Sequence, residues 1–218
     1  MQQQERLTAF VDRLARADTR ADAFNQYAYG NVYNDIRRAN LQRYLDQMTA
    51  VGLATMLVME APGYRGMRLT GVPVASRKLL TRGVPELGLF GIERGYRDVP
   101  EPGFERVNGE ASATAVWGTL AAHGSVALVW NAYPFHPHQP GLALTNRKPR
   151  RSETETGIGF LRDLIDLFKP ETIVAVGNVA DESLSRMAIP HLKVRHPAQG
   201  GKTAFVSGLT AILDSRQD

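Results

Sequence analysis

Three polar residues, each placed directly after an apolar stretch, have the types needed for hydrolytic chemistry. Glu60 follows residues 53–59, Asn131 follows residues 125–130, and His196 comes shortly after residues 192–194. A carboxylate, an amide and an imidazole can accept a proton, read a donor–acceptor pair and donate a hydrogen bond. Each residue alone is also common in turns. If the stretches are strands of one parallel sheet, all three side chains meet at its carboxyl edge, where ligands bind in such sheets.

The elements that would position these residues alternate between strands and helices. The run 53–59 is apolar at consecutive positions, which is typical of a strand covered by helices on both faces. We predict an α/β three-layer sandwich with a central, mainly parallel four-stranded sheet flanked by helices. The predicted strands are 53–59, 125–130, 172–176 and 192–194, and the predicted helices are 5–17, 36–48, 75–81, 111–123, 153–168 (with Ser152 as N-cap), 180–187 and 203–213.

Composition limits the possible classes of protein. The chain has 218 residues, 43% of them hydrophobic, and we predict one domain, 1–218, with residues 1–50 as a helical extension packed on it. The absence of Cys excludes disulfides, thiolate catalysis and iron–sulfur clusters. We find neither an apolar signal core nor a run of about 18 apolar residues, so we predict a cytoplasmic protein without a membrane partner. We also predict a monomer. The net charge of +4 is compatible with a polyanionic partner.

Other kinds of site find little support in the sequence. It contains no Gly-rich loop ending in Gly-Lys-Ser/Thr and no dinucleotide fingerprint after the first predicted strand. His136 and His138 flank Pro137, but no third ligand lies nearby in the sequence. We therefore predict no metal and no cofactor.

Five short motifs, in order along the chain, resemble those of the uracil-DNA glycosylase superfamily. They are Glu60-Ala61-Pro62-Gly63, Asn131, Asn146-Arg147-x-Pro149, Val176-Gly177 and His196-Pro197-Ala198. The resemblance runs from about residue 53 to the C-terminus and is nearest to the thermophile-type, iron–sulfur branches. Two cluster positions of those branches fall on Phe135 and Gly157, so the cluster is missing here, replaced by packing around Phe135. The resemblance implies an enzyme that flips uracil or another deaminated base out of DNA and hydrolyses its N-glycosidic bond in base excision repair.

The resemblance also implies roles for individual residues. His196 would stabilise the departing base, Asn131 would read its edge, and Glu60 would orient water. The aromatic residue that usually stacks on the base aligns with Val74, so Tyr64 or Phe90 would stack instead. Ala61, Pro62 and Gly63 would line the rest of the pocket. The residues expected to contact DNA are Arg147, Lys148, Gln199, Gly200, Gly201 and Lys202.

Two positions depart from the best-known branch of the superfamily. Ala61 stands where that branch has the Asp that positions water, and Gly63 stands where it has the Tyr that excludes thymine. Two alternatives follow. The first is a catalytically weak or inactive DNA-binding or base-binding module of the same fold, and the second is a hydrolase of free nucleosides.

Overall fold

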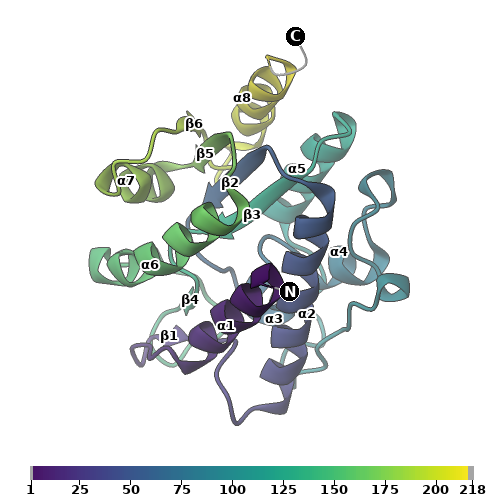
Figure 1. The fold of residues 1–218 in the computed structure, drawn as a ribbon. Coiled ribbons are helices and arrows are strands. Elements are labelled where there is room, and N and C mark those ends of the chain that lie inside the picture. The colour runs from purple at the N-terminus through teal and green to yellow at the C-terminus, as the bar shows by residue number, and fades with distance from the viewer. Residues whose placement is uncertain (1, 216–218) are drawn as a thin grey trace.

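The computed structural model describes residues 2–215, and its order of elements confirms the predicted α/β class (Figure 1). The helices are α1 (Gln2–Arg16), α2 (Val32–Val51), α3 (Met67–Thr70), α4 (Arg77–Arg82), α5 (Ala111–Ala122), α6 (Arg151–Phe168), α7 (Asn178–Arg186) and α8 (Lys202–Asp214). The strands are β1 (Ala23–Phe24), β2 (Thr55–Met59), β3 (Ala127–Asn131), β4 (His136–Pro137), β5 (Thr172–Val176) and β6 (Leu192–Val194). Two 3-10 turns, η1 (Pro85–Leu87) and η2 (Ile92–Arg94), lie between α4 and α5.

The central sheet has four strands in the order β3-β2-β5-β6, and all of its pairs are parallel. Every residue of β2 and β3 is buried, as expected from apolar runs that face helices on both sides. Helices α6 and α7 contact each other on one face of the sheet, and α5 and α8 contact each other on the other (Figure 1). The three-layer prediction is therefore confirmed.

Helix α2 covers the free edge of the sheet at β3. The Tyr44 hydroxyl accepts a hydrogen bond from the Val129 N–H at 2.7 Å and faces the Val129 carbonyl at 3.1 Å. An unpaired strand edge is otherwise open to other chains, and buried backbone groups need partners. Helices α1 and α2 also contribute residues to the same hydrophobic core as the sheet.

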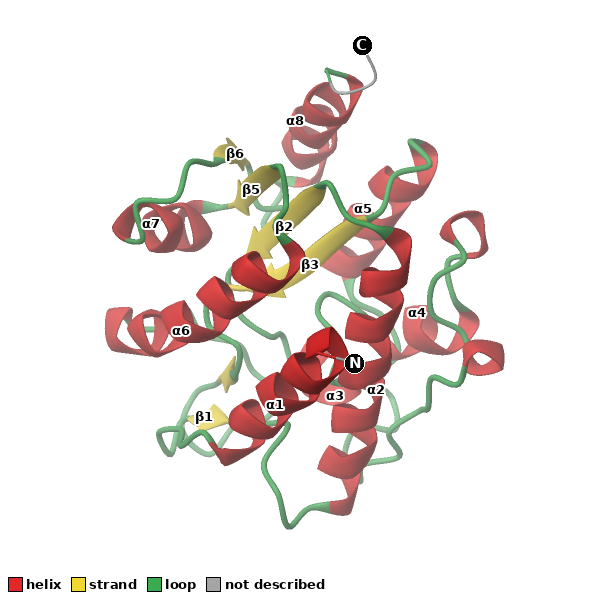
Figure 2. Cartoon of the chain, in the orientation of Figure 1, coloured by secondary structure: helices red, strands yellow, loops and turns green. Residues whose placement is uncertain are grey.

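The strand register places the carboxyl ends of β2 and β3 side by side. Met59 pairs with Asn131, so β2 and β3 end at the same level. The arrowheads of β2, β3 and β5 point to the same side of the sheet (Figure 2). Helix α6 approaches this side closely, because a Cβ at Gly157 would lie 1.9 Å from the Ala132 carbonyl oxygen. Phe135 is fully buried beside it, edge-to-face with the Phe160 ring at 6.0 Å.

Some local features differ from the sequence predictions. The prediction of Ser152 as N-cap is wrong, because α6 begins at Arg151 and its cap is Arg150, whose N–H donates to Glu153 Oε2 at 2.7 Å. The short helix α3 was not among the predicted helices. Strands β1 and β4 form an antiparallel pair that no sequence pattern indicated.

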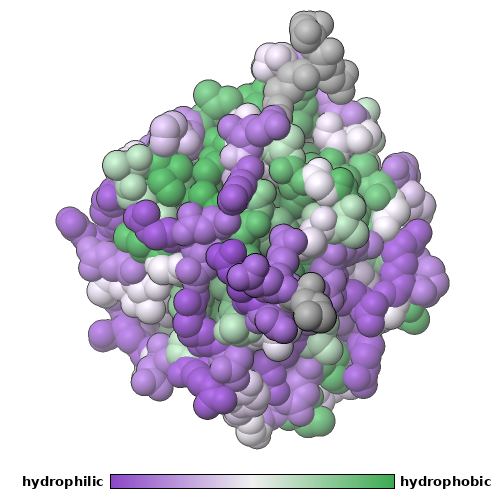
Figure 3. Space-filling view, viewed as in Figure 1, coloured by the Kyte–Doolittle hydropathy of each residue, from purple (hydrophilic) through white to green (hydrophobic). Residues whose placement is uncertain are grey.

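Figure 3 shows a largely hydrophilic lower half of one face, with hydrophobic residues gathered above, over the sheet. Within residues 2–215, no helix is both long and apolar enough to cross a bilayer. The same residues contain no cluster of three or more side chains suited to hold a metal ion.

Candidate active site

A cavity of about 490 Å³ opens at the carboxyl ends of the parallel strands. It brings together, from four separate segments of the chain, residues that the sequence analysis singled out. Those residues are Glu60, Ala61, Pro62, Gly63, Asn131, Arg147, Lys148, His196 and Gln199. The predicted convergence of a carboxylate, an amide and an imidazole is thus present in the fold.

Asn131 is the last residue of β3 and is only 1% exposed. Its side-chain Nδ2 contacts the Met67 Sδ at 2.8 Å. A thioether sulfur is a weak acceptor, so this amide gives up little when a stronger acceptor enters the cavity. Burial makes the amide selective, because an unmatched polar group here would lose its hydrogen bonds to water without replacement.

His196 follows β6 and packs on Gly177, the residue after β5. A Cβ at Gly177 would lie 3.0 Å from the His196 Cβ, and the Gly177 φ of +88° also favours glycine. The Ala198 N–H donates to His196 Nδ1 at 3.1 Å, which leaves the proton of the neutral ring on Nε2. Burial, together with the nearby Arg195 charge, lowers the pKa of His196. The ring therefore offers a neutral Nε2–H donor near pH 7.

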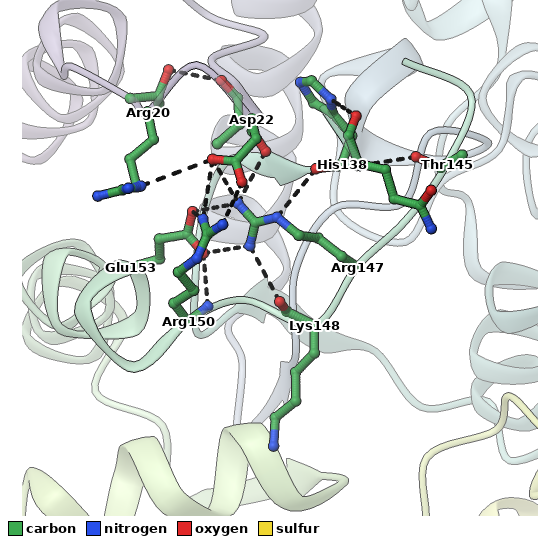
Figure 4. Close-up of polar contacts among 11 residues, drawn as sticks. Arg20, Asp22, His138, Thr145, Arg147, Lys148, Arg150 and Glu153 are labelled. Atoms are coloured by element: carbon green, nitrogen blue, oxygen red, sulfur yellow. Dashed lines mark hydrogen bonds and ion pairs between the residues drawn. The ribbon is translucent and has the colours of Figure 1, made fainter. Parts of the chain in front are cut away.

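Glu60 is half-buried at the end of β2. Burial raises the pKa of its carboxyl, while the positive charge of Lys148 opposes this effect. Lys148 lines the same cavity, and its amine extends away from the neighbouring ion pairs (Figure 4). A carboxyl and an ammonium group thus line the same cavity.

Neither Phe90 nor Tyr64, the two aromatic residues predicted to stack on the base, lines the cavity. The Phe90 prediction is corrected. Phe90 is fully buried and packs against the rings of Tyr44 and Trp117, so a base cannot reach it. Tyr64 does not line the cavity but is half-buried against a second small apolar cluster that includes Phe104. Val74, the aligned position, does line the cavity, without an aromatic ring.

Arg147 was expected to contact DNA, but its guanidinium is engaged inside the protein (Figure 4). It binds both carboxylate oxygens of Glu153, at 2.7 and 2.6 Å, and donates to the backbone carbonyls of Asp22 and His138. Arg150 completes the network by binding the Asp22 carboxylate. The Arg147 prediction is corrected: this side chain fixes the loop between β4 and α6 and is not free to bind a phosphate.

The turn after His196 is only partly available to a ligand. Gly201 is buried, and a Cβ there would lie 2.0 Å from the His196 carbonyl oxygen, so this residue shapes the turn and cannot touch DNA as predicted. Gln199 and Gly200 are exposed and adopt positive φ, and exposed Lys202 begins α8. Of these, Gln199 lines the cavity.

Among the lining residues that were not predicted as site residues, Glu110 and Asn146 carry polar side chains that bear on the chemistry. Glu110 precedes α5 and resembles an ordinary acidic residue at a helix start, so only its long-range contacts reveal it. Asn146 belongs to a quoted motif, yet its orientation is set from afar: its Oδ1 accepts from the Tyr64 N–H at 3.0 Å and lies 3.3 Å from His136 Nε2. No described residue accepts a hydrogen bond from its Nδ2, and Asn146 lines the cavity.

Comparisons with known proteins agree with this architecture. The structure of the chain is similar to the crystal structure of SMUG2 from Pedobacter heparinus, with a TM-score of 0.66, 12% sequence identity, and coverage of 99% of this chain and 98% of that chain. At that identity the similarity concerns the fold. No curated protein sequence matches the chain. A family model, the uracil DNA glycosylase superfamily, matches residues 47–212, well over half of the 218 residues. The protein belongs to the uracil DNA glycosylase superfamily.

Proposed function

We propose that the protein is a DNA glycosylase that hydrolyses the N-glycosidic bond of uracil, or of another deaminated base, flipped out of DNA in base excision repair. The observation that carries this proposal is the meeting of Asn131 and His196 in one cavity, with His196 Nε2 free to donate. Family membership supports a glycosylase of this type, and the base and the activity are the proposed part.

Asn131 supplies base recognition in this proposal. Its side-chain amide presents a donor and an acceptor in one plane, which complements the O4 and N3–H of uracil. Cytosine presents the opposite pattern at these atoms. Each mismatched, buried polar group costs about 1–3 kcal/mol, which is sufficient for strong discrimination between the two bases.

His196 supplies stabilisation of the leaving group. As the glycosidic bond breaks, negative charge grows on the base and the sugar acquires oxocarbenium character. A neutral Nε2–H held by the Ala198 contact can donate to the pyrimidine O2 without first losing a proton. The lowered pKa keeps the ring in this neutral form.

The proposal is tested by incubating the purified protein with oligonucleotides that carry uracil, hypoxanthine, xanthine or a thymine mismatch. We expect abasic sites from at least one deaminated base, and for a uracil substrate we expect Asn131→Ala to slow cleavage by about tenfold or more, since one buried recognition group is lost. DNA binding without cleavage of any of these bases would select the second candidate, a binding module. The binding module is favoured by Ala61, which stands where the best-known branch of the superfamily has the Asp that positions water.

Lys148 and Lys202 are the cations proposed to contact phosphates. We expect Lys148→Ala and Lys202→Ala each to weaken binding of any DNA sequence and to reduce the slope of log K against log salt by about 1. Lys78→Ala is the matched control, because Lys78 is exposed on α4 and does not line the cavity. Fluorescence anisotropy at several salt concentrations measures the slope, and equal slopes for all three variants would contradict the assignment.

A further inference from the structure

The carboxyl group of Glu110 has no structural partner although it is buried in the cavity wall. Its Oε2 is shielded from solvent and makes no hydrogen bond among the described residues. Glu110 is the N-cap of α5, yet its side chain makes no capping bond to the free N–H groups of that helix. Those groups are the nearest stabilising partners for a carboxylate in this position. The side chain is instead directed into the cavity that holds Asn131 and His196.

Two glycines in the loop after β2 make room for this carboxyl. A Cβ at Gly66 would lie 2.2 Å from Glu110 Oε2, and a Cβ at Gly63 would lie 3.0 Å from Oε1. Gly63 has no positive φ, whereas Gly66, with φ −118° and ψ −116°, adopts a backbone conformation that residues with a side chain disfavour. Close approach of the carboxyl is a separate reason for glycine at both positions, and at Gly66 a side chain would collide with it.

Asn146 provides a second polar group beside the same glycine. The point where a Gly63 Cβ would lie is 3.0 Å from Glu110 Oε1 and 3.6 Å from Asn146 Nδ2. Because Asn146 Oδ1 already accepts from the Tyr64 N–H, its Nδ2 is the atom left free to donate. A carboxylate acceptor and an amide donor beside the same glycine can hold a water molecule, which needs two or more polar partners.

We propose that Glu110 is the general base that activates the attacking water, with Asn146 as a positioning residue for that water. This inference rests on the proposed glycosylase function. The water oxygen forms a bond to the sugar C1′ while the C1′–N bond breaks and its electron pair leaves with the base. Glu110 takes the proton from the water and later returns it to solvent, and the base anion, held by His196 Nε2–H, takes up a proton from solvent.

The surroundings of Glu110 suit this task. Burial raises the pKa of its carboxyl to about 7, and a general base works best when its pKa lies near the working pH. The other charged or titratable side chains that line the cavity are Glu60, Arg147, Lys148, Arg195 and His196. Among them Glu60 is the other carboxyl that could act as the base. The positive charge of Lys148 opposes the rise of its pKa, and no pair of glycines makes room beside it as Gly63 and Gly66 do for Glu110.

The test is single-turnover cleavage of the base that the wild-type protein removes fastest, measured between about pH 5.5 and 9. We expect the wild-type rate to rise as the pH passes about 7, where Glu110 ionises. Glu110→Gln should lower the rate at high pH by about a hundredfold and remove this pH dependence. Glu105→Gln is the control, since Glu105 is exposed in the preceding loop, and it should keep both the rate and the profile. Binding to an oligonucleotide with a tetrahydrofuran abasic-site analogue should stay within about threefold in Glu110→Gln.

Thermal unfolding separates this role from a structural one. If the carboxyl serves catalysis, Glu110→Gln should melt at or above the wild-type temperature at pH 8, because a buried carboxylate without a partner is removed. A lower melting temperature with weak binding would overturn the proposal in favour of a structural role. Full activity of Glu110→Gln would also overturn it, since the amide can donate a hydrogen bond but cannot take a proton. Loss of the pH dependence in Glu60→Gln instead would assign the base to Glu60.

The two proposals fail differently. A wild-type protein that cleaves while Glu110→Gln cleaves equally well contradicts only the role of Glu110. A wild-type protein that cleaves none of the tested bases contradicts the proposed function and, with it, this inference.

Discussion

Replacing His196 with Ala should slow cleavage of the glycosidic bond by about 10²–10³ while leaving DNA binding nearly unchanged. The expected loss is large because the Nε2–H of a neutral ring acts where negative charge develops, and water in the emptied space is a poorly oriented substitute. The Ala198 contact to Nδ1 fixes this orientation. Single-turnover kinetics with a uracil-containing oligonucleotide measures the loss.

The matched control is His191→Ala. His191 precedes β6 and pairs with Asp181 at 3.1 Å, and it does not line the cavity. We expect its activity to stay within about twofold of wild type. Because the pKa of His196 is lowered, its protonation should not reduce the wild-type rate until the pH falls below about 6.5, the ordinary value for His. Equal rates for wild type and His196→Ala would contradict the role of this ring.

Replacing Arg147 with Met should reduce the free energy of unfolding by about 3–5 kcal/mol, the cost of leaving a buried carboxylate without its partner. Glu153, whose side chain is 3% exposed, loses its two-pronged ion pair and keeps only the Arg150 N–H at 2.7 Å and the Arg150 guanidinium at 3.5 Å. Chemical denaturation at pH 7 measures the change. Arg151→Ala is the control, since the Arg151–Glu155 pair is exposed and contributes less than about 1 kcal/mol.

The acid dependence of stability checks the same network. Burial alone would raise the pKa of Glu153, but hydrogen bonds from Arg147 and from the Arg150 backbone hold it below the ordinary value. The Arg150 hydrogen bond likewise lowers the pKa of Asp22. Carboxylates with lowered pKa values stabilise the fold above their unfolded-state pKa, and this contribution is lost as the pH falls. The difference in free energy of unfolding between wild type and Arg147→Met should therefore become smaller below about pH 4. A difference in free energy of unfolding that does not change with pH would contradict the ionic origin of the stabilisation.

Much of the fold could be predicted from the sequence because its central strands are short, apolar and followed by polar turns. Consecutive burial at residues 55–59 is a local signal, and parallel pairing then brings the strand ends to one edge. The β1–β4 pair could not be predicted in this way, because each strand has two residues and the partners lie more than a hundred positions apart. The same holds for the Tyr44 contact that closes the edge of β3.

The candidate site was predictable where its residues follow strands and was mispredicted where they lie in loops. Phe90 has a positive φ of 59° in a Gly-rich loop that folds inward, so its ring joins the core. Arg147 lies in a basic run that looks solvated, yet its partner Asp22 is far away in the chain. Glu110 gave no local signal, because what distinguishes it is the absence of a partner in the folded protein.

The contact between Gly66 and Glu110 has a consequence for the evolution of this protein. Since a methyl group at Gly66 would lie 2.2 Å from the carboxyl oxygen, a side chain at position 66 requires Glu110 to move out of its present position. Lineages that lose the carboxyl are released from this steric constraint on position 66, and lineages that gain a side chain there must shorten or displace Glu110. We expect the two positions to covary among close homologues, with glycine at 66 wherever an acidic residue occupies 110.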